Sequence, residues 1–243
     1  MSFVLGVIMQ VFLSEIEQQY FLELKEFYSP YFPASEELDA FIDKALQLDW
    51  DNRNPRQMIF QVQRFVSLAT EIDSIRPARD GLQMLFLKCC MESLAKLSSK
   101  ETKEFYECFA DCFSEDGRNY ILNKFSLSFI ECSKNGLTIH EGANLNIADI
   151  LSIIKAMRDM VVHEGNYWEL QLFAHDKDSV WLTHIETNKQ LLSKATYNNS
   201  SKQVVTYHFE TTLQYEKFIF FFVEACKNYI SNYIDSKMMQ HKY

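Results

Sequence analysis

The stretch IADILSIIKAMRDMVVHEG, residues 147–165, decides the fold expected for this chain. Its apolar residues recur at intervals of three and four, as on one face of an α-helix, and they are Ile147, Ile150, Leu151, Ile154, Met157 and Val161. Asn144 or Asn146 can cap the start of this helix, and Gly165 is a natural stop at its end. The spacing therefore predicts an amphipathic helix that packs into a helical core.

The chain before this stretch has the same helical periodicity. Helices are expected from the N-terminus to Tyr28, from Ser35, after the turn at 51–55, after Arg76-Pro77, at 101–113 and at 118–131. The predicted core face of the third helix comprises Ile59, Val62, Phe65, Val66, Ala69 and Ile72. The face predicted for the fourth helix comprises Leu82, Leu85, Phe86, Cys89, Cys90, Ser93, Leu94 and Leu97.

The periodicity changes from near four to two after the opening stretch. Strands are predicted at 167–173, 179–186, 189–196 and 202–209, separated by turn-rich segments. Together they form a small antiparallel meander at about 167–209, inserted into the helical fold. His140-Glu141 is expected in a loop.

A long helix follows the predicted strands. Thr211 and Gln214 have the spacing of a capping box, and the helix is expected to run to about Ile234. Its apolar residues occupy more than one face, so it needs two packing partners. It is either central to the bundle or also faces a second subunit.

Composition agrees with a single, mainly α-helical domain over residues 1–243. The chain has 20 Phe and 12 Tyr but only 6 Gly and 4 Pro, and this scarcity of helix breakers favours long helices. The net charge of −9 argues against wholesale electrostatic binding to nucleic acid or to an anionic membrane. The apolar start, residues 3–13, is too short to span a bilayer, so no membrane is expected as a partner.

The 6 cysteines do not form a metal-binding pattern. No pair of CxxC motifs is present, and five of the six cysteines lie in apolar helical patterns. They are interpreted as reduced residues, most of them in the core, which indicates a cytoplasmic protein. His175, His184 and His208 do not have metal-site spacing, and GxGxxG, GxxxxGK[ST], HExxH and GxSxG are all missing.

One cluster has side chains that could take part in catalysis. It comprises Arg158, Asp159 and His163, at the end of the helix predicted over 147–164. Arginine offers a permanently charged fork to phosphate oxygens, and histidine can move a proton near neutral pH. These groups suffice for RNA cleavage without a metal, in which the 2′-hydroxyl attacks the adjacent phosphorus and the 5′-oxygen leaves.

Helix geometry restricts how these side chains can meet. Positions 158 and 163 are about 140° apart around an ideal helix, so their side chains diverge if the helix is regular. They converge only if the helix ends or distorts near Val162, or if a second copy of the motif faces the first across a dimer axis. The motif can also have a purely structural role. In that case Arg158 pairs with Asp159 or Glu164, and His163 caps helix carbonyls.

The segment from Arg158 to Gly165 resembles the signature of the HEPN superfamily, an Arg with a polar residue after it and a His four to six residues beyond the Arg. The resemblance implies a four-helix up-and-down core, frequent homodimers with facing motifs, and often metal-independent endoribonuclease activity in toxin–antitoxin, phage-defence or plasmid systems. Asp159 stands where Asn is commoner, and the predicted strands are an elaboration.

The resemblance also assigns roles to residues. Arg158 would stabilise the phosphate, His163 would transfer a proton, and Asp159 would orient one of them, with no metal and no cofactor. Tyr167 is a candidate for substrate contact, although a Tyr at the start of a strand usually packs. The partners implied are RNA, a second copy of the chain, and an antitoxin or other protein. The alternative is a non-catalytic HEPN-like helical interaction module.

Overall fold

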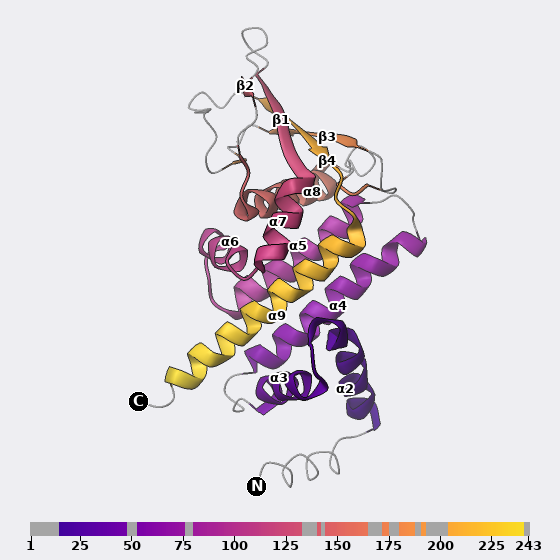
Figure 1. Ribbon diagram of the computed structural model, residues 1–243, viewed down its shortest axis with the longest axis vertical. Coiled ribbons are helices and arrows are strands. Elements are labelled where there is room, and N and C mark those ends of the chain that lie inside the picture. The colour runs from indigo at the N-terminus through magenta and orange to yellow at the C-terminus, as the bar shows by residue number, and fades with distance from the viewer. Residues whose placement is uncertain are drawn as a thin grey trace.

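The structure is a computed structural model that describes residues 15–47, 53–75, 80–132, 140–141, 144–164, 172–174, 180–187, 191–192 and 204–240. These residues form a mainly helical fold with a small antiparallel sheet, as predicted (Figure 1). The helices are α2 (Glu15–Tyr28), the 3₁₀ turn η1 (Ser29–Tyr31), α3 (Ser35–Gln47), α4 (Asn54–Ile75), α5 (Asp80–Leu97), α6 (Thr102–Ala110), α7 (Glu115–Lys124), α8 (Ile147–Glu164) and α9 (Tyr215–Gln240). The strands are β1 (Phe125–Cys132), β2 (His140–Glu141), β3 (Trp181–Thr187) and β4 (Val205–Thr211).

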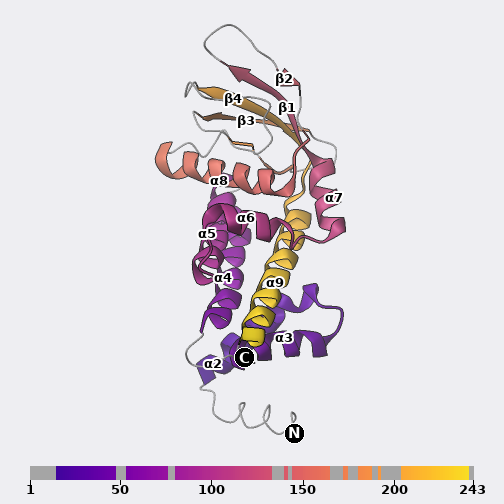
Figure 2. The ribbon, with the colours of Figure 1, turned by 90° about the vertical axis from the view of Figure 1, so that its left-hand side faces the viewer.

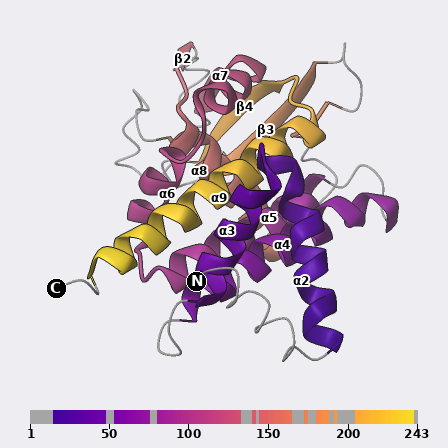
Figure 3. The same ribbon diagram turned by 60° about the horizontal axis from the view of Figure 1, so that its bottom comes forward.

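Helix α9 is the centre of the helical part. It packs against α3, α4, α6, α7 and η1, and Figure 3 shows it passing between the N-terminal helices and α6. Its buried residues include Phe218, Phe222, Cys226 and Ile230. The broad apolar surface predicted for this helix is therefore largely covered within one chain.

Helix α8 lies between the sheet and the other helices. Figure 2 shows it running across the ends of α4 and α5, with the strands on its opposite side. It packs against α5, α6 and α7. The three candidate catalytic residues, Arg158, Asp159 and His163, all lie in the C-terminal half of this helix.

The sheet has the strand order β2-β1-β4-β3, with all neighbours antiparallel. Strand β4 is central, pairing with β1 from Thr211 to Val205 and with β3 over the same residues. Burial alternates along β4, so that Tyr207 and Phe209 face the core while His208 and Glu210 face outward. One face of the sheet thus closes the core above α8.

The helix predicted at 118–131 is wrong in its second half. The helix α7 ends at Lys124, and β1 begins at Phe125. In β1, Phe125 and Leu127 are buried whereas Ser126 is exposed, which is the alternation of a strand. Because this strand pairs with β4, which is distant in the sequence and lies beyond α8, its partner could not be inferred from local pattern.

The sheet therefore contains different strands from those of the predicted meander. The strands predicted at 179–186 and 202–209 correspond to β3 and β4, but β1 and β2 precede α8 in the chain. Residues 172–173 and 191–192 are the described parts of the predicted strands 167–173 and 189–196, and they are not strand. His140-Glu141, expected in a loop, forms β2 and pairs with Phe129 and Ile130.

The capping box predicted at Thr211 is also wrong. Thr211 ends β4, and its hydroxyl donates to the Leu172 carbonyl at 2.8 Å and accepts the Leu213 N–H at 3.2 Å. The Gln214 N–H donates instead to the Tyr120 hydroxyl oxygen at 3.1 Å. The polar groups before α9 therefore tie strand to helix, and α9 extends past the predicted end to Gln240.

The core face predicted for α5 is correct at Cys90 and Leu94, which are buried, but Leu85, Phe86 and Cys89 are only partly buried. The prediction also omits four buried residues, Met84, Leu87, Lys88 and Met91. A lysine in the buried face is unexpected from hydrophobic periodicity, because periodicity assigns charged residues to the solvent. The core face predicted for α4 agrees better with the structure, because Ile59, Val62, Val66 and Ala69 are all buried.

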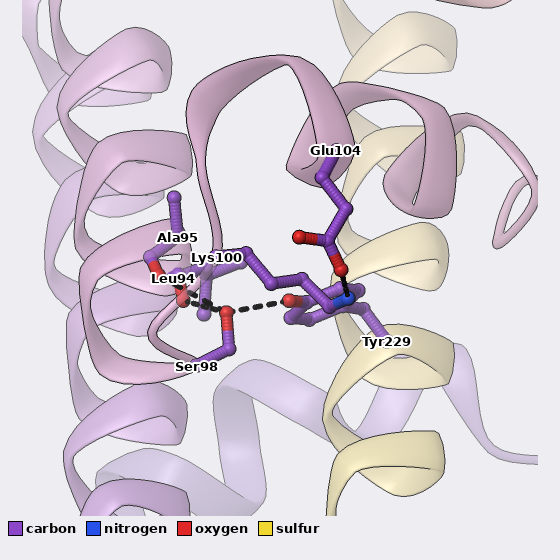
Figure 4. Close-up of polar contacts among 6 residues, drawn as sticks. All are labelled: Leu94, Ala95, Ser98, Lys100, Glu104 and Tyr229. Atoms are coloured by element: carbon purple, nitrogen blue, oxygen red, sulfur yellow. Dashed lines mark hydrogen bonds and ion pairs between the residues drawn. The ribbon is translucent and has the colours of Figure 1, made fainter.

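The turn after α5 stores backbone strain at Ser99, whose φ of 57° lies in the left-handed region. The Lys100 N–H donates to the Ala95 carbonyl at 3.0 Å and the Ser99 N–H to the Lys96 carbonyl at 3.1 Å, the pattern of a Schellman motif. Figure 4 shows the adjoining contacts, in which Ser98 meets the Leu94 and Ala95 carbonyls and the Tyr229 hydroxyl.

Replacing Ser99 by Gly is expected to raise the free energy of unfolding by about 1 kcal/mol, because glycine has no Cβ to strain this conformation. Urea unfolding followed by circular dichroism measures the change. Ser99→Ala is the matched control: it removes the hydroxyl but keeps the Cβ, so it should bring no gain. Equal stabilisation by both variants would contradict the strain at this position.

Candidate functional site

The helix that carries the motif begins with a reciprocal cap. The Asp149 N–H donates to the Asn146 side-chain oxygen at 2.9 Å, and the Asn146 N–H donates to the Asp149 carboxylate at 3.1 Å. Of the two predicted caps, Asn146 is therefore the one used. The predicted core face is buried at Ile147, Ile150, Leu151, Ile154 and Met157. The side chain of Val161 lies outside the described residues.

Arg158 is held by two carboxylates. Its Nη1 donates to Asp159 Oδ1 at 2.8 Å, and its Nη2 lies 3.5 Å from Glu92 Oε2 on α5. The hydrogen bond to Asp159, reinforced by the charge of Glu92, raises the pKa of the guanidinium, which stays charged. Within the described part of the chain its Nε is buried and has no hydrogen-bond partner.

His163 lies in the last turn of α8, which continues to Glu164. The helix does not end before His163, so the first route by which Arg158 and His163 could converge in one chain is absent from this structure. The side chains of His163 and Glu164 lie outside the described residues, and so does the whole of Tyr167. The structure therefore brings Arg158 and Asp159 together and gives only the backbone position of His163.

Three residues in the cluster around Arg158, namely Lys88, Glu92 and Tyr106, were not predicted from the sequence. Lys88 on α5 is 2% exposed, and its Nζ lies 3.1 Å from Glu92 Oε1 and 5.2 Å from the centre of the Tyr106 ring. Burial lowers the pKa of Lys88, an effect that Glu92 opposes. Glu92 thus bridges Lys88 and Arg158 with its two oxygens.

Tyr106 on α6 completes this cluster. Its hydroxyl is buried and, among the described residues, has no hydrogen-bond partner. Burial raises the pKa of Tyr106, and the nearby carboxylates of Glu92 and Asp159 raise it further. The hydroxyl therefore keeps its proton and remains a hydrogen-bond donor. No sequence motif marks Tyr106, because a Tyr in an amphipathic helix is usually a packing residue.

Among the residues described with their side chains, two further histidines and two cysteines show packing contacts. His208 stacks on Phe129 with ring centres 4.0 Å apart, lies 3.4 Å from Glu131, and faces His184 at 6.0 Å. Cys112 Sγ donates to the Cys108 carbonyl at 3.3 Å. The cysteines described with their side chains, at 89, 90, 108, 112 and 226, are free thiols. No group of three or more potential metal ligands occurs in the described ranges.

Comparison with known proteins gives no relative: no protein-family model, curated protein or solved structure matches this chain. The resemblance to the HEPN superfamily therefore depends on the motif around Arg158 alone. In the described part of the chain, no helix combines the length and the apolar character required to cross a membrane.

Proposed function

We propose that this chain is a HEPN-type, metal-independent endoribonuclease that uses Arg158, Asp159 and His163 at a site shared by two subunits of a homodimer. The observation that carries the proposal is the pairing of Arg158 with Asp159 at the C-terminal end of α8. This pair supplies a permanently charged guanidinium, already oriented by its neighbour, one turn before a histidine.

The shared site follows from helix geometry. Because α8 is helical through residue 164, positions 158 and 163 lie about 140° apart around its axis. A two-fold axis near the end of α8 would bring the Arg158 of one subunit toward the His163 of the other. Val162, which is 49% exposed, lies between these positions and leaves an apolar spot at this end of the helix.

The reaction needs one proton removed and one supplied. The 2′-oxygen of the RNA loses its proton as it bonds to the adjacent phosphorus, the bond to the 5′-oxygen breaks, and that oxygen takes up a proton. His163 would transfer a proton, while Arg158 would stabilise the negative charge that develops on the phosphate oxygens. The products are a 2′,3′-cyclic phosphate and a 5′-hydroxyl.

The proposal includes partners and a compartment. RNA is the substrate, a second copy of the chain completes the site, and an antitoxin or other protein partner would control it. The reduced state of the five described thiols is compatible with the cytoplasm.

A second candidate function is a non-catalytic helical interaction module, and two observations favour it. Glu92 and Asp159 both contact Arg158, as in a structural ion-pair network. Helix α8 also runs across α4 and α5 (Figure 2), whereas the up-and-down core implied by the HEPN resemblance has its helices alongside one another.

The test of the proposed function is incubation of purified protein with mixed RNA in EDTA, followed by analysis of the new ends. Cleavage that leaves 2′,3′-cyclic phosphates is expected from the wild type and not from Arg158→Ala prepared in the same way. Lys155→Ala, which removes an exposed cation from the same helix, should cleave as the wild type does. Lack of cleavage at micromolar protein would support the interaction module.

Glu92 provides a prediction about RNA affinity. Its carboxylate competes with a phosphate for Arg158, and it is 46% exposed, so the competing pair is weak. Glu92→Gln is expected to bind a short RNA about two- to fivefold more tightly, which corresponds to the typical strength of an exposed ion pair. Fluorescence anisotropy at fixed low salt measures this in a His163→Ala background.

The matched control for Glu92 is Glu36→Gln on α3, which lies at the far end of the helical part from α8 (Figures 1 and 2). It makes the same change in net charge, so it should leave RNA affinity nearly unchanged at matched salt. Equal effects of the two variants would mean that the total charge of the protein limits RNA binding, and not the ion pair between Glu92 and Arg158.

A further inference from the structure

Lys88 occupies a position on α5 where an apolar side chain would be expected. Its side chain is 2% exposed, on the helix face that also carries Met84, Leu87 and Met91. A buried ammonium group loses its hydration, and this loss lowers the pKa of Lys88. Methionine, which is similar in length and uncharged, would keep the packing without that loss. Residues that break a packing rule in this way are expected near functional sites.

Glu92 is the acidic partner of this buried lysine. Lys88 Nζ lies 3.1 Å from Glu92 Oε1, one helical turn further along α5, and 5.2 Å from the centre of the Tyr106 ring on α6. The positive charges of Lys155 and Arg158 on α8 lower the pKa of Lys88 further, whereas Glu92 raises it. The carboxylate of Glu92 therefore compensates the buried charge of Lys88.

The ion-pair distances around Arg158 are unequal. Asp159 Oδ1 lies 2.8 Å from Arg158 Nη1, which is a hydrogen-bond distance. Glu92 Oε2 lies 3.5 Å from Arg158 Nη2, beyond the usual range for a hydrogen bond and longer than the 3.1 Å between Glu92 and Lys88. Glu92 is therefore held mainly by Lys88, and it contacts Arg158 without a full hydrogen bond.

The engaged oxygen of Glu92 restricts its pairing with Arg158. A guanidinium binds a carboxylate most strongly when two parallel N–H groups meet both carboxylate oxygens. One oxygen of Glu92 contacts Lys88, so this two-point pair cannot form while the lysine is in place. The side chain of Arg158 is 24% exposed, and its exposed part can then accept another anion.

We propose that Lys88 is a positioning residue for Arg158: it holds one oxygen of Glu92 and so prevents Glu92 from closing on the guanidinium that would bind an RNA phosphate. The identity of that anion rests on the proposed function, whereas the role of Lys88 rests on the contacts around Glu92. Lys88 would not touch the RNA itself, because its side chain is buried.

The experiment is a double-mutant cycle with Lys88→Met and Glu92→Gln, made in the His163→Ala background. Fluorescence anisotropy on a short RNA at fixed low salt gives the dissociation constants. Lys88→Met should weaken binding about two- to fivefold, which corresponds to the typical strength of an exposed ion pair. In the presence of Glu92→Gln most of this loss should disappear, because no carboxylate at position 92 can close on Arg158.

Lys103→Met is the matched control for Lys88→Met. Lys103 is an exposed lysine on α6, so its loss makes the same change in net charge and should leave RNA affinity nearly unchanged at matched salt. Lys88→Met should be at least as stable in urea as the wild type, because it removes a buried charge and leaves Glu92 half-exposed to water. An equal loss of affinity with and without Glu92→Gln would overturn the proposal.

A second readout separates this inference from the proposed function. Phenylglyoxal modifies guanidinium groups, and mass spectrometry gives its rate at Arg158 relative to the exposed Arg64 on α4 in the same sample. Lys88→Met should slow the modification of Arg158, Glu92→Gln should speed it, and the double variant should resemble Glu92→Gln. If these rates hold but the wild type binds no RNA, the proposed function fails and the role of Lys88 stands. Equal rates in all four proteins would overturn the role of Lys88.

Discussion

Replacement of His163 by Ala is expected to lower the rate of RNA cleavage by about 10²- to 10⁴-fold, the usual contribution of a general acid or base. The variant removes the group that would transfer the proton, while Arg158 and its contacts to Asp159 and Glu92 remain. RNA binding should therefore change much less than the cleavage rate does. Single-turnover cleavage and anisotropy on the same RNA separate the two effects.

The control for this variant is His184→Ala. His184 is an exposed histidine on β3, so its loss tests whether removing any surface histidine slows cleavage. Its cleavage rate should equal that of the wild type. A His163→Ala protein that cleaves as fast as the wild type would remove His163 from the reaction, even if RNA cleavage itself is real.

The second large effect is expected on stability, from Asp80→Ala. Asp80 is 1% exposed in the first turn of α5, and its Oδ2 accepts the N–H groups of Leu172 and Phe173 at 2.7 Å each. Alanine would leave two buried donors without this acceptor, and the free energy of unfolding should fall by about 3 kcal/mol or more. Urea unfolding measures the change.

Asp116→Ala is the matched control for Asp80. Asp116 also lies in the first turn of a helix, α7, but it is exposed, so it shares the favourable interaction with the helix dipole and lacks the buried contacts. Its loss should cost about 0.3–1 kcal/mol. If the two variants were equally stable, the contacts of Asp80 with residues 172 and 173 would not hold this segment in place.

The sequence predicted the helices better than the sheet. Helices α4, α8 and α9 show the three-and-four spacing of apolar residues, which depends only on neighbours in the chain. Strand β1 has a strand pattern in the sequence, because Phe125, Leu127 and Phe129 alternate with Ser126 and Ser128, and the helix predicted at 118–131 overlooked it. Its pairing with β4 crosses α8, so only the tertiary structure could reveal that pairing.

The candidate site was predicted only in part, because only contacts between residues near in the sequence leave a local pattern. Arg158 and Asp159 were found because they are adjacent in the chain and their contact is local. Glu92, Lys88 and Tyr106 come from two other helices, and Lys88 lies on a buried face that the hydrophobic pattern assigned to apolar residues. Residues that contact one another only through helix packing have no characteristic spacing in the sequence, so a motif search does not find them.

The most direct test of a site shared by two subunits is mixing two inactive variants, Arg158→Ala and His163→Ala, after unfolding and refolding them together. A mixed dimer holds one intact pairing of Arg158 with His163 only if the two residues come from different subunits. Random assortment should then restore about a quarter of the wild-type cleavage, because half of the dimers are mixed and each has one site of two. If the refolded mixture contains mixed dimers and still does not cleave RNA, the shared site is contradicted.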